Sequence, residues 1–362
     1  MGDMEEKVSP KQDYSLLDRT IHRLAFANRS IQLSAADMER TLYGGRFLDV
    51  AIDRPVFITS LPRAGTTLLL EIFSRIPGIA THRYRDMPFV MAPVLWQEFS
   101  RHFRKQSILK ERAHGDGMQV GYDSPEAFEE VLWHAFWPKK YRPDGIIPWS
   151  EDDRNDEFRD FLVEHMQKII ALRAEGQTRA GRYVSKNNAN IARIGLLRRL
   201  FPDAYIVVPF RHPVDHAASM LRQHRNFLAR HASDPFSRKY MHDIGHFEFG
   251  QLHRPIRFGE TPEGDTETIE YWLSYWVSAF THIASLQTQV VLVSFENLCA
   301  GGTAAFTTLA DRVGIGADTY GGDIASVFRP PPVYRKDIVI RDSRLLERAS
   351  GLHGQLQELS IL

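Results

Sequence analysis

The stretch Pro55-Val-Phe-Ile-Thr-Ser-Leu-Pro-Arg-Ala-Gly-Thr-Thr-Leu-Leu-Leu-Glu-Ile-Phe73 decides the fold of this chain. Its apolar run at 56–58 has the length of a buried strand, and after a loop at 60–65 apolar residues recur at helical spacing. The pattern predicts a strand, a tight turn and a helix. Gly65 allows the backbone to approach a ligand closely, and the unsatisfied N–H groups at a helix start attract phosphate-like anions.

The cation of this loop stands before its glycine. In the phosphate loop of nucleotide triphosphatases, G-x-x-x-x-G-K-[ST], a Lys directly follows the last glycine and the Ser or Thr holds magnesium. Here Thr66 follows Gly65, and the positive charge belongs to Arg63. The loop is therefore an anion site of another kind, or a strand–turn–helix with an ordinary turn glycine.

Composition limits the classes of function. The 362 residues are 43% apolar and 25% charged, which suits one elaborated α/β domain with insertions. The 45 Lys and Arg residues balance 45 Asp and Glu residues, so no overall basic field indicates a nucleic-acid partner. A single cysteine, Cys299, excludes an internal disulfide framework and a cysteine-based zinc site.

The domain organisation follows from periodicity and hydropathy. Helical spacing over 13–50 predicts an N-terminal helical extension, residues 1–50, before one domain over 51–362. No apolar run approaches the ~20 residues that span a bilayer, and the charged N-terminus lacks the apolar core of a signal peptide. We therefore expect a cytoplasmic protein with no transmembrane segment.

Two later segments also read as strands that precede helices. Residues 182–186 end in Lys186, and the strand at 205–210 is followed by Arg211. Alternating strands and helices predict a parallel sheet with right-handed crossovers. Because ligands bind at the carboxyl ends of such strands, Arg63, Lys186 and Arg211 are expected to point their charges at one edge of the sheet.

These residues carry a resemblance to a known family. The loop at 62–67 resembles the 5′-phosphosulfate loop, P-R-[ST]-G-T-T-L, of bacterial and Golgi-type sulfotransferases that use 3′-phosphoadenosine 5′-phosphosulfate (PAPS); Ala64 departs from the usual Ser or Thr. Arg211 and Ser219 have the spacing of the family's R-D-P-x-x-x-x-x-S motif, with His212 in place of Asp and Pro213 kept. The two motifs occur in the family's order, about 150 residues apart in the chain.

The resemblance implies an α/β, P-loop-like three-layer fold with a central parallel sheet flanked by helices, plus helical insertions. It implies an enzyme that moves a sulfonate from PAPS to a hydroxyl or amine of a carbohydrate, lipid or small metabolite, with no metal required. The residues expected to bind the donor are Arg63, Ala64, Gly65, Thr66, Thr67, Leu68, Arg211 and Ser219.

Two cations are expected to take part in catalysis. Arg63 would neutralise the leaving 5′-phosphate, and its role is electrostatic because a guanidinium does not give up its proton at neutral pH. Lys186 aligns with the Lys of the family's L-K-S-P strand end. Asn188 stands where cytosolic aryl sulfotransferases have a His base, which separates this chain from that subclass.

The base has several candidates. Bacterial relatives have a catalytic Glu about 23 residues beyond the loop Arg, and counting from Arg63 reaches Asp86; the alternative is that Asp86 pairs with Arg83 or Arg85. Glu126 is the second candidate, because His114 and the residues 123–129 resemble the family's H…D-x-P-E-E segment, and a helix-capping role is its alternative. His82 ranks third.

Other segments leave their roles open. The polar, His-rich stretch at 226–266 is expected to be a lid or substrate loop, or an insertion, and His242 and His246 read as solvated or hydrogen-bonded rather than metal-binding. Residues 334–336 are either donor contacts or a basic surface patch. A phosphate-loop kinase, which the missing Gly-Lys-Thr triplet disfavours, and a non-catalytic nucleotide-binding module are the competing functions.

Overall fold

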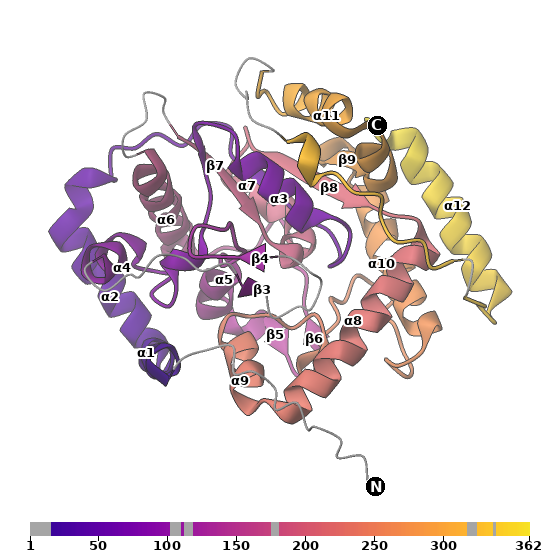
Figure 1. Ribbon diagram of the computed structural model, residues 1–362, viewed down its shortest axis with the longest axis horizontal. Coiled ribbons are helices and arrows are strands. Elements are labelled where there is room, and N and C mark those ends of the chain that lie inside the picture. Colours follow the sequence, from indigo (N-terminus) through magenta and orange to yellow (C-terminus); the bar gives the residue numbers. More distant parts are fainter. Residues whose placement is uncertain (1–15, 102–109, 112–118, 175–180, 317–323, 336–337) are drawn as a thin grey trace, which may run out of the picture.

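A parallel five-stranded sheet of order β2-β7-β1-β8-β9 lies at the centre of the fold (Figure 1). The structure is a computed structural model that describes residues 16–101, 110–111, 119–174, 181–316, 324–335 and 338–362. The strands of the sheet are β1 (Val56–Ile58), β2 (Ile79–Ala80), β7 (Arg182–Lys186), β8 (Tyr205–Phe210) and β9 (Val291–Ser294). Every neighbouring pair in this sheet is parallel, so the predicted α/β class is confirmed.

Helices cover the sheet on both faces. The α-helices are α1 (Leu16–Ala25), α2 (Arg29–Tyr43), α3 (Thr66–Ser74), α4 (Pro93–Ser100), α5 (Glu130–Phe136), α6 (Asp156–Ala174), α7 (Ile194–Leu200), α8 (Pro213–Ser233), α9 (Pro235–Asp243), α10 (Ile269–Ser285), α11 (Phe295–Arg312) and α12 (Ser343–Leu359). Two short antiparallel pairs complete the strands: β3 (Lys110–Glu111) with β4 (Gln119–Val120), and β5 (Tyr141–Arg142) with β6 (Gly145–Ile146).

Alternate residues of each central strand enter different hydrophobic cores. In β1, Phe57 belongs to a large core with α5, α6, α8 and α10, whereas Val56 and Ile58 belong to a second core with α3 and α11. Neighbouring side chains of a strand point to opposite faces, so a sheet covered on both faces needs continuous apolar strands. The short apolar runs in the sequence are therefore the middle layer of a three-layer fold.

The described part of the N-terminal extension is fastened to the domain by a buried charge cluster. Glu39 of α2 and Lys168 of α6 are both fully buried, with Glu39 Oε1 3.0 Å from Lys168 Nζ. Glu164 Oε1 lies 2.9 Å from the same Nζ, and the Leu95 N–H donates to Glu39 Oε2 at 2.7 Å. Burial raises the pKa of Glu39, and Lys168 opposes that rise. Within the described ranges, no helix has the length and hydropathy of a membrane span.

Residues 226–266, expected to be a lid or an insertion, begin with the last turns of α8, continue through α9 and end in a loop. Two positive-φ glycines, Gly245 at 77° and Gly250 at 68°, shape this loop. Its backbone is held by histidines of α8: the Gly250 N–H donates to His224 Nδ1 at 3.1 Å, and the Gln251 N–H donates to His231 Nδ1 at 3.2 Å. These hydrogen bonds hold the loop of this segment against α8.

We expect Glu39→Gln to lower the free energy of unfolding by about 3 kcal/mol, because it leaves the buried Lys168 ammonium without one of its carboxylates. Urea denaturation checks this value. Asp37→Asn on the exposed face of the same helix is the matched control, and it should change stability by less than about 0.5 kcal/mol. Equal effects of the two substitutions would contradict the role given to the cluster.

Buried neutral histidines should make the protein acid-sensitive. Burial lowers the pKa of both His216 and His253 to about 3, from the ordinary value of 6.5. Below 6.5 the unfolded chain therefore binds more protons than the folded one, and stability that is present above pH 6.5 is lost as the pH falls towards 3.

We predict a loss of about 2 kcal/mol of unfolding free energy per such histidine between pH 7 and pH 5. Urea denaturation at the two pH values measures the loss, which should shrink by one histidine's share in His253→Gln. Stability that does not change over this interval would show that these side chains titrate normally.

Candidate functional site

The loop between β1 and α3 has a backbone that only a small residue permits at Gly65. Gly65 has φ 99° and Arg63 has φ 75°, both in the left-handed region. A Cβ atom on Gly65 would lie 2.2 Å from Cδ2 of Phe295, so the ring of that residue closes the space beside the loop. The turn leads directly into α3, whose first N–H groups have no acceptor within the helix. The strand, tight turn and helix that the sequence predicts are therefore present, with the helix start facing the turn.

A cleft of about 710 Å³ opens beside this loop. It is bordered by loop and α3 residues, by the carboxyl ends of β7 and β8, and by the segment 326–332. Of the residues expected to act on or bind the donor, those that line it are Arg63, Gly65, Thr66, Thr67, Leu68, Glu126, Lys186 and Arg211. Ala64 is buried within the loop, and Ser219 is buried on α8. Asp86 does not line the cleft.

The two predicted phosphate motifs meet at one point. Arg211 Nη1 donates to the Arg63 carbonyl at 3.1 Å, and Arg63 Nε donates to Ser219 Oγ at 3.4 Å. Arg211 is 4% exposed, and its Nε atom is buried without a hydrogen-bond partner among the described residues. Burial lowers the pKa of Arg211, and Glu296 and Asp215 counteract that shift. The structure thus brings together residues about 150 positions apart and leaves a buried donor atom beside the cleft.

The ends of β1 and β7 are joined by side-chain hydrogen bonds. Lys186 pairs in register with Ile58, so it ends β7 beside the start of the loop, where it lines the cleft. Thr66 Oγ1 donates to Asn188 Oδ1 at 3.1 Å, and Thr59 Oγ1 donates to the Asn188 carbonyl at 3.1 Å. Asn188 therefore restrains the loop through these two hydrogen bonds. It stands at the sequence position where cytosolic aryl sulfotransferases have a His base.

His216 of α8 contacts the loop between β1 and α3, and no motif in the sequence indicates this role. Its Nε2 donates to the Pro62 carbonyl at 2.9 Å, which requires the proton on that nitrogen. Burial and the nearby Arg211 and Arg63 lower the pKa of His216, so the ring is neutral. His216 therefore holds the loop in place from α8.

Asp86 lies in a buried ion pair rather than in the cleft. Arg173 Nη2 is 2.6 Å from both of its carboxylate oxygens, and the Arg83 N–H donates to Asp86 Oδ2 at 2.8 Å. Arg85 pairs with Asp123 instead. His82 is also buried, at 1% exposure, and stacks on His165 with ring centres 5.0 Å apart. This geometry argues against Asp86 and His82 as bases, since neither reaches the cleft.

Glu126 is the predicted carboxylate that does line the cleft. Its N–H donates to the His82 carbonyl at 3.0 Å, and its Oε1 accepts the Ala127 N–H at 2.7 Å. The next helix, α5, begins only at Glu130, so Glu126 does not cap it. Pro125 instead forms a strand-like bridge with Arg83. His114 lies outside the described residues.

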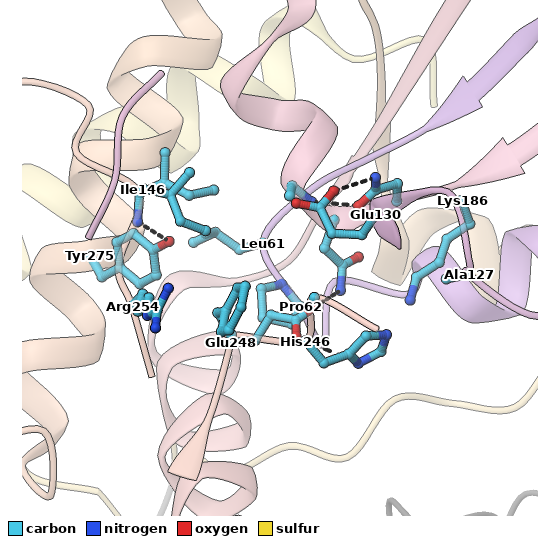
Figure 2. A pocket seen from close by; sticks show the side chains of 16 residues that line it. Leu61, Pro62, Ala127, Glu130, Ile146, Lys186, His246, Glu248, Arg254 and Tyr275 are labelled. Carbon is cyan, nitrogen blue, oxygen red and sulfur yellow. Dashed lines mark hydrogen bonds and ion pairs between the residues drawn. The ribbon is translucent and has the colours of Figure 1, made fainter. Parts of the chain in front are cut away.

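Two further cleft residues, His246 and Glu248, lie in the loop after α9; the sequence predicted a solvated or hydrogen-bonded His246, and no pattern indicated Glu248. Asn188 Nδ2 donates to Glu248 Oε1 at 3.3 Å, and His246 Nδ1 lies 3.6 Å from Glu248 Oε2. Both side chains also border a smaller cavity of about 30 Å³ that adjoins the cleft at Pro62 and Lys186 (Figure 2). The stretch 226–266 was expected to be a lid or substrate loop, or an insertion, but it has no motif that indicates which of its side chains reach the cleft.

The C-terminal segment closes the Arg211 side of the cleft. The Pro332 carbonyl accepts from Arg211 Nη2 at 3.1 Å, and the Tyr334 and Arg335 N–H groups each donate to Asp215 Oδ1 at 2.7 Å. Arg335 also forms an ion pair with the same carboxylate. Tyr334 and Arg335, expected as donor contacts or surface residues, thus bind α8, and Lys336 lies outside the described residues. No group of three potential metal ligands occurs in the part of the chain described.

Solved structures similar to this chain include the sulfotransferase STF1 of Mycobacterium tuberculosis H37Rv (14% identity over 94% of this chain and 88% of that one, TM-score 0.47). They also include the sulfotransferase STF9 of Mycobacterium avium (13% identity over 97% of this chain and 86% of that one, TM-score 0.46). A third is the sulfotransferase domain of the Synechococcus PCC 7002 olefin synthase (15% identity over 84% of this chain and 96% of that one, TM-score 0.37).

A search of curated proteins found no matching sequence. The model of the sulfotransferase family matches residues 55–318, which include the loop, Lys186, Arg211, Ser219 and Glu248. That match covers more than half of the chain and spans both phosphate motifs. The chain therefore belongs to the sulfotransferase family.

Proposed function

We propose that this protein transfers the sulfonate of PAPS to an acceptor hydroxyl. The observation that carries the proposal is the meeting of Arg63, Arg211 and Ser219 at one edge of the sheet, beside the cleft. In the reaction the acceptor oxygen bonds to sulfur, the bond from sulfur to the 5′-phosphate oxygen breaks, and the acceptor proton passes to a base. The products are the sulfate ester and 3′,5′-adenosine bisphosphate.

The donor is expected to bind across the two motifs. The N–H groups at 65–68 and the hydroxyls of Thr66 and Thr67 would hold the 5′-phosphosulfate, as helix starts hold anions. Arg211 and Ser219 would hold the 3′-phosphate, and the buried Nε of Arg211 supplies a donor for it. This fit rests on the left-handed turn at Gly65, which packs against the Phe295 ring, and on the Arg211 cation beside the cleft.

Stabilisation of the leaving group falls to fixed charges. Arg63 and Lys186 both line the cleft, at the ends of adjacent strands. Negative charge develops on the 5′-phosphate as the sulfonate departs, and preorganised cations lower the energy of that state without reorganising. Since the sulfonate carries one negative charge, these cations and the loop amides suffice in this scheme without magnesium, unlike in many phosphoryl transfers.

Glu126 is the carboxylate that we assign as the base. It lines the cleft together with Lys186, whereas Asp86 is engaged by Arg173 outside it. A carboxylate next to the acceptor hydroxyl can take the proton as the oxygen–sulfur bond forms. The geometry therefore favours the second sequence candidate over the first.

Arg211→Ala should weaken the binding of 3′,5′-adenosine bisphosphate by about 2 kcal/mol, because a charge-assisted pair with the 3′-phosphate is lost. Titration calorimetry without magnesium measures this. Adenosine 5′-monophosphate, which has no 3′-phosphate, should lose clearly less affinity than the bisphosphate, because for it the variant removes only the hydrogen bond from Arg211 to the loop. Arg225→Ala on the exposed face of the same helix is the matched control. Equal losses for both nucleotides would refute the assigned contact.

Glu126→Gln should lower the turnover number by about 100-fold or more while the affinity for the bisphosphate stays unchanged, because only proton removal is lost. Transfer of labelled sulfonate to a panel of alcohols and phenols provides the assay. Turnover equal to wild type would exclude Glu126 as the base.

Asp86→Asn should lower the stability of the protein rather than its turnover number. It breaks the buried pair with Arg173 and should cost about 3 kcal/mol of unfolding free energy, while the folded fraction keeps its turnover number. Denaturant titration and an activity assay normalised to folded protein separate the two effects. A large fall in turnover at unchanged stability would return the catalytic role to Asp86.

A further inference from the structure

The cleft continues past the expected donor site along helix α8. Arg211 and Ser219 lie at the start of this helix, and Phe227 and His231, which also line the cleft, lie two to three turns farther on. At 1.5 Å per residue, the eight positions from Ser219 to Phe227 place that ring about 12 Å beyond the phosphate motif along the helix axis. One helix thus connects two chemically different parts of the cleft.

The far part of the cleft is apolar. It is lined by Phe227 of α8, Met241 of α9 and Phe249 of the following loop. Each of these residues is at most 8% exposed. The rings of Phe227 and Phe249 stack at 6.2 Å with an angle of 18° between their planes, and Phe249 also packs on Trp272 at 5.6 Å. Such a wall offers dispersion contacts and an apolar environment but few hydrogen-bonding groups.

This wall has a fixed shape. A Cβ atom on Gly250 would lie 2.8 Å from Phe227 Cβ and 2.7 Å from His231 Nδ1, so the loop fits closely against α8 only with glycine there. The His224 and His231 rings accept the N–H groups of Gly250 and Gln251. The apolar surface is consequently preformed, which reduces the conformational entropy lost when a ligand binds.

Polar side chains stand between the two parts. Glu248 Oε1 accepts from Asn188 Nδ2, whose amide oxygen in turn accepts from Thr66 of the donor loop, and His246 lies beside the same carboxylate. This chain of contacts sets Glu248 and His246 next to the loop expected to hold the sulfonate. The Glu248 carboxylate can accept a hydrogen bond from an acceptor hydroxyl there, and the His246 imidazole can accept or donate one. An acceptor that carries a negative charge would be repelled by Glu248 and Glu126.

We propose that Phe227, Met241 and Phe249 form the acceptor subsite, and that it takes an uncharged alcohol or phenol carried on an apolar body. The hydroxyl faces Glu248, His246 and Glu126, and the apolar body lies against the wall. A sugar would leave its hydroxyls against apolar surface without hydrogen bonds, which costs binding free energy. The proposal rests on the sulfotransferase function proposed above and adds the class of its acceptor.

Binding of 2-naphthol and of N-acetylglucosamine tests the proposal directly. Each is titrated into the full chain by calorimetry, with and without saturating 3′,5′-adenosine bisphosphate, and sulfated products are measured by mass spectrometry with PAPS. We expect 2-naphthol to bind at least about 50-fold more tightly than the sugar, from the apolar area it buries. Its sulfate ester should also be the product formed at the higher kcat/KM.

Met241→Ser should weaken 2-naphthol binding about tenfold while the bisphosphate affinity stays the same. Met38→Ser, at an exposed methionine of α2, is the matched control and should change neither affinity. Comparison of the two acceptors in wild type needs no variant, so the test stands if Met241→Ser does not fold. Tighter binding or faster sulfation of the sugar would overturn the proposal, as would unchanged naphthol binding in folded Met241→Ser.

The two proposals fail in distinguishable ways. Absence of bisphosphate binding would refute the donor assignment, whereas naphthol binding in the absence of nucleotide reports on the acceptor subsite alone. Bisphosphate binding together with a preference for the sugar would leave the sulfotransferase assignment intact and refute the apolar acceptor.

Discussion

The hydrogen bond from Arg211 to the Arg63 carbonyl is the contact on which the site depends. It joins the ends of two adjacent strands and sets a buried guanidinium beside the loop between β1 and α3. A charged side chain that is 4% exposed needs compensation, and it receives this from the backbone carbonyls of Arg63 and Pro332 and from the nearby Glu296 carboxylate. The same contacts keep the cation in place before any ligand arrives.

Neighbouring interactions hold the loop from other sides. His216 donates to the Pro62 carbonyl, and Asn188 accepts from Thr66, so α8 and the end of β7 both restrain it. Arg63 occupies the left-handed region, which costs a non-glycine residue about 1 kcal/mol and is tolerated where surrounding contacts fix the backbone. A loop restrained in this way presents its amides to an anion without further ordering, which is the condition for strong electrostatic stabilisation.

Local patterns predicted the sheet, the loop and both phosphate motifs, because strand length, glycine position and residue spacing are properties of short segments. The burial of Asp86 outside the cleft was not predictable in this way. Asp86 has the family spacing from Arg63, yet Arg173, 87 positions away, engages its carboxylate, and no pattern around Asp86 announces that partner. The position of Glu248 and His246 at the cleft was not predictable for a related reason: long-range packing of an irregular loop on α8 brings them there.

A crystal structure with 3′,5′-adenosine bisphosphate would show whether one nucleotide bridges the two motifs. We expect the 5′-phosphate on the amides of residues 65–68 near Arg63, the 3′-phosphate on Arg211 and Ser219, and a path from the 5′-phosphate towards Glu126 and Glu248. A 3′-phosphate placed away from Arg211, or a nucleotide bound outside this cleft, would contradict this expectation.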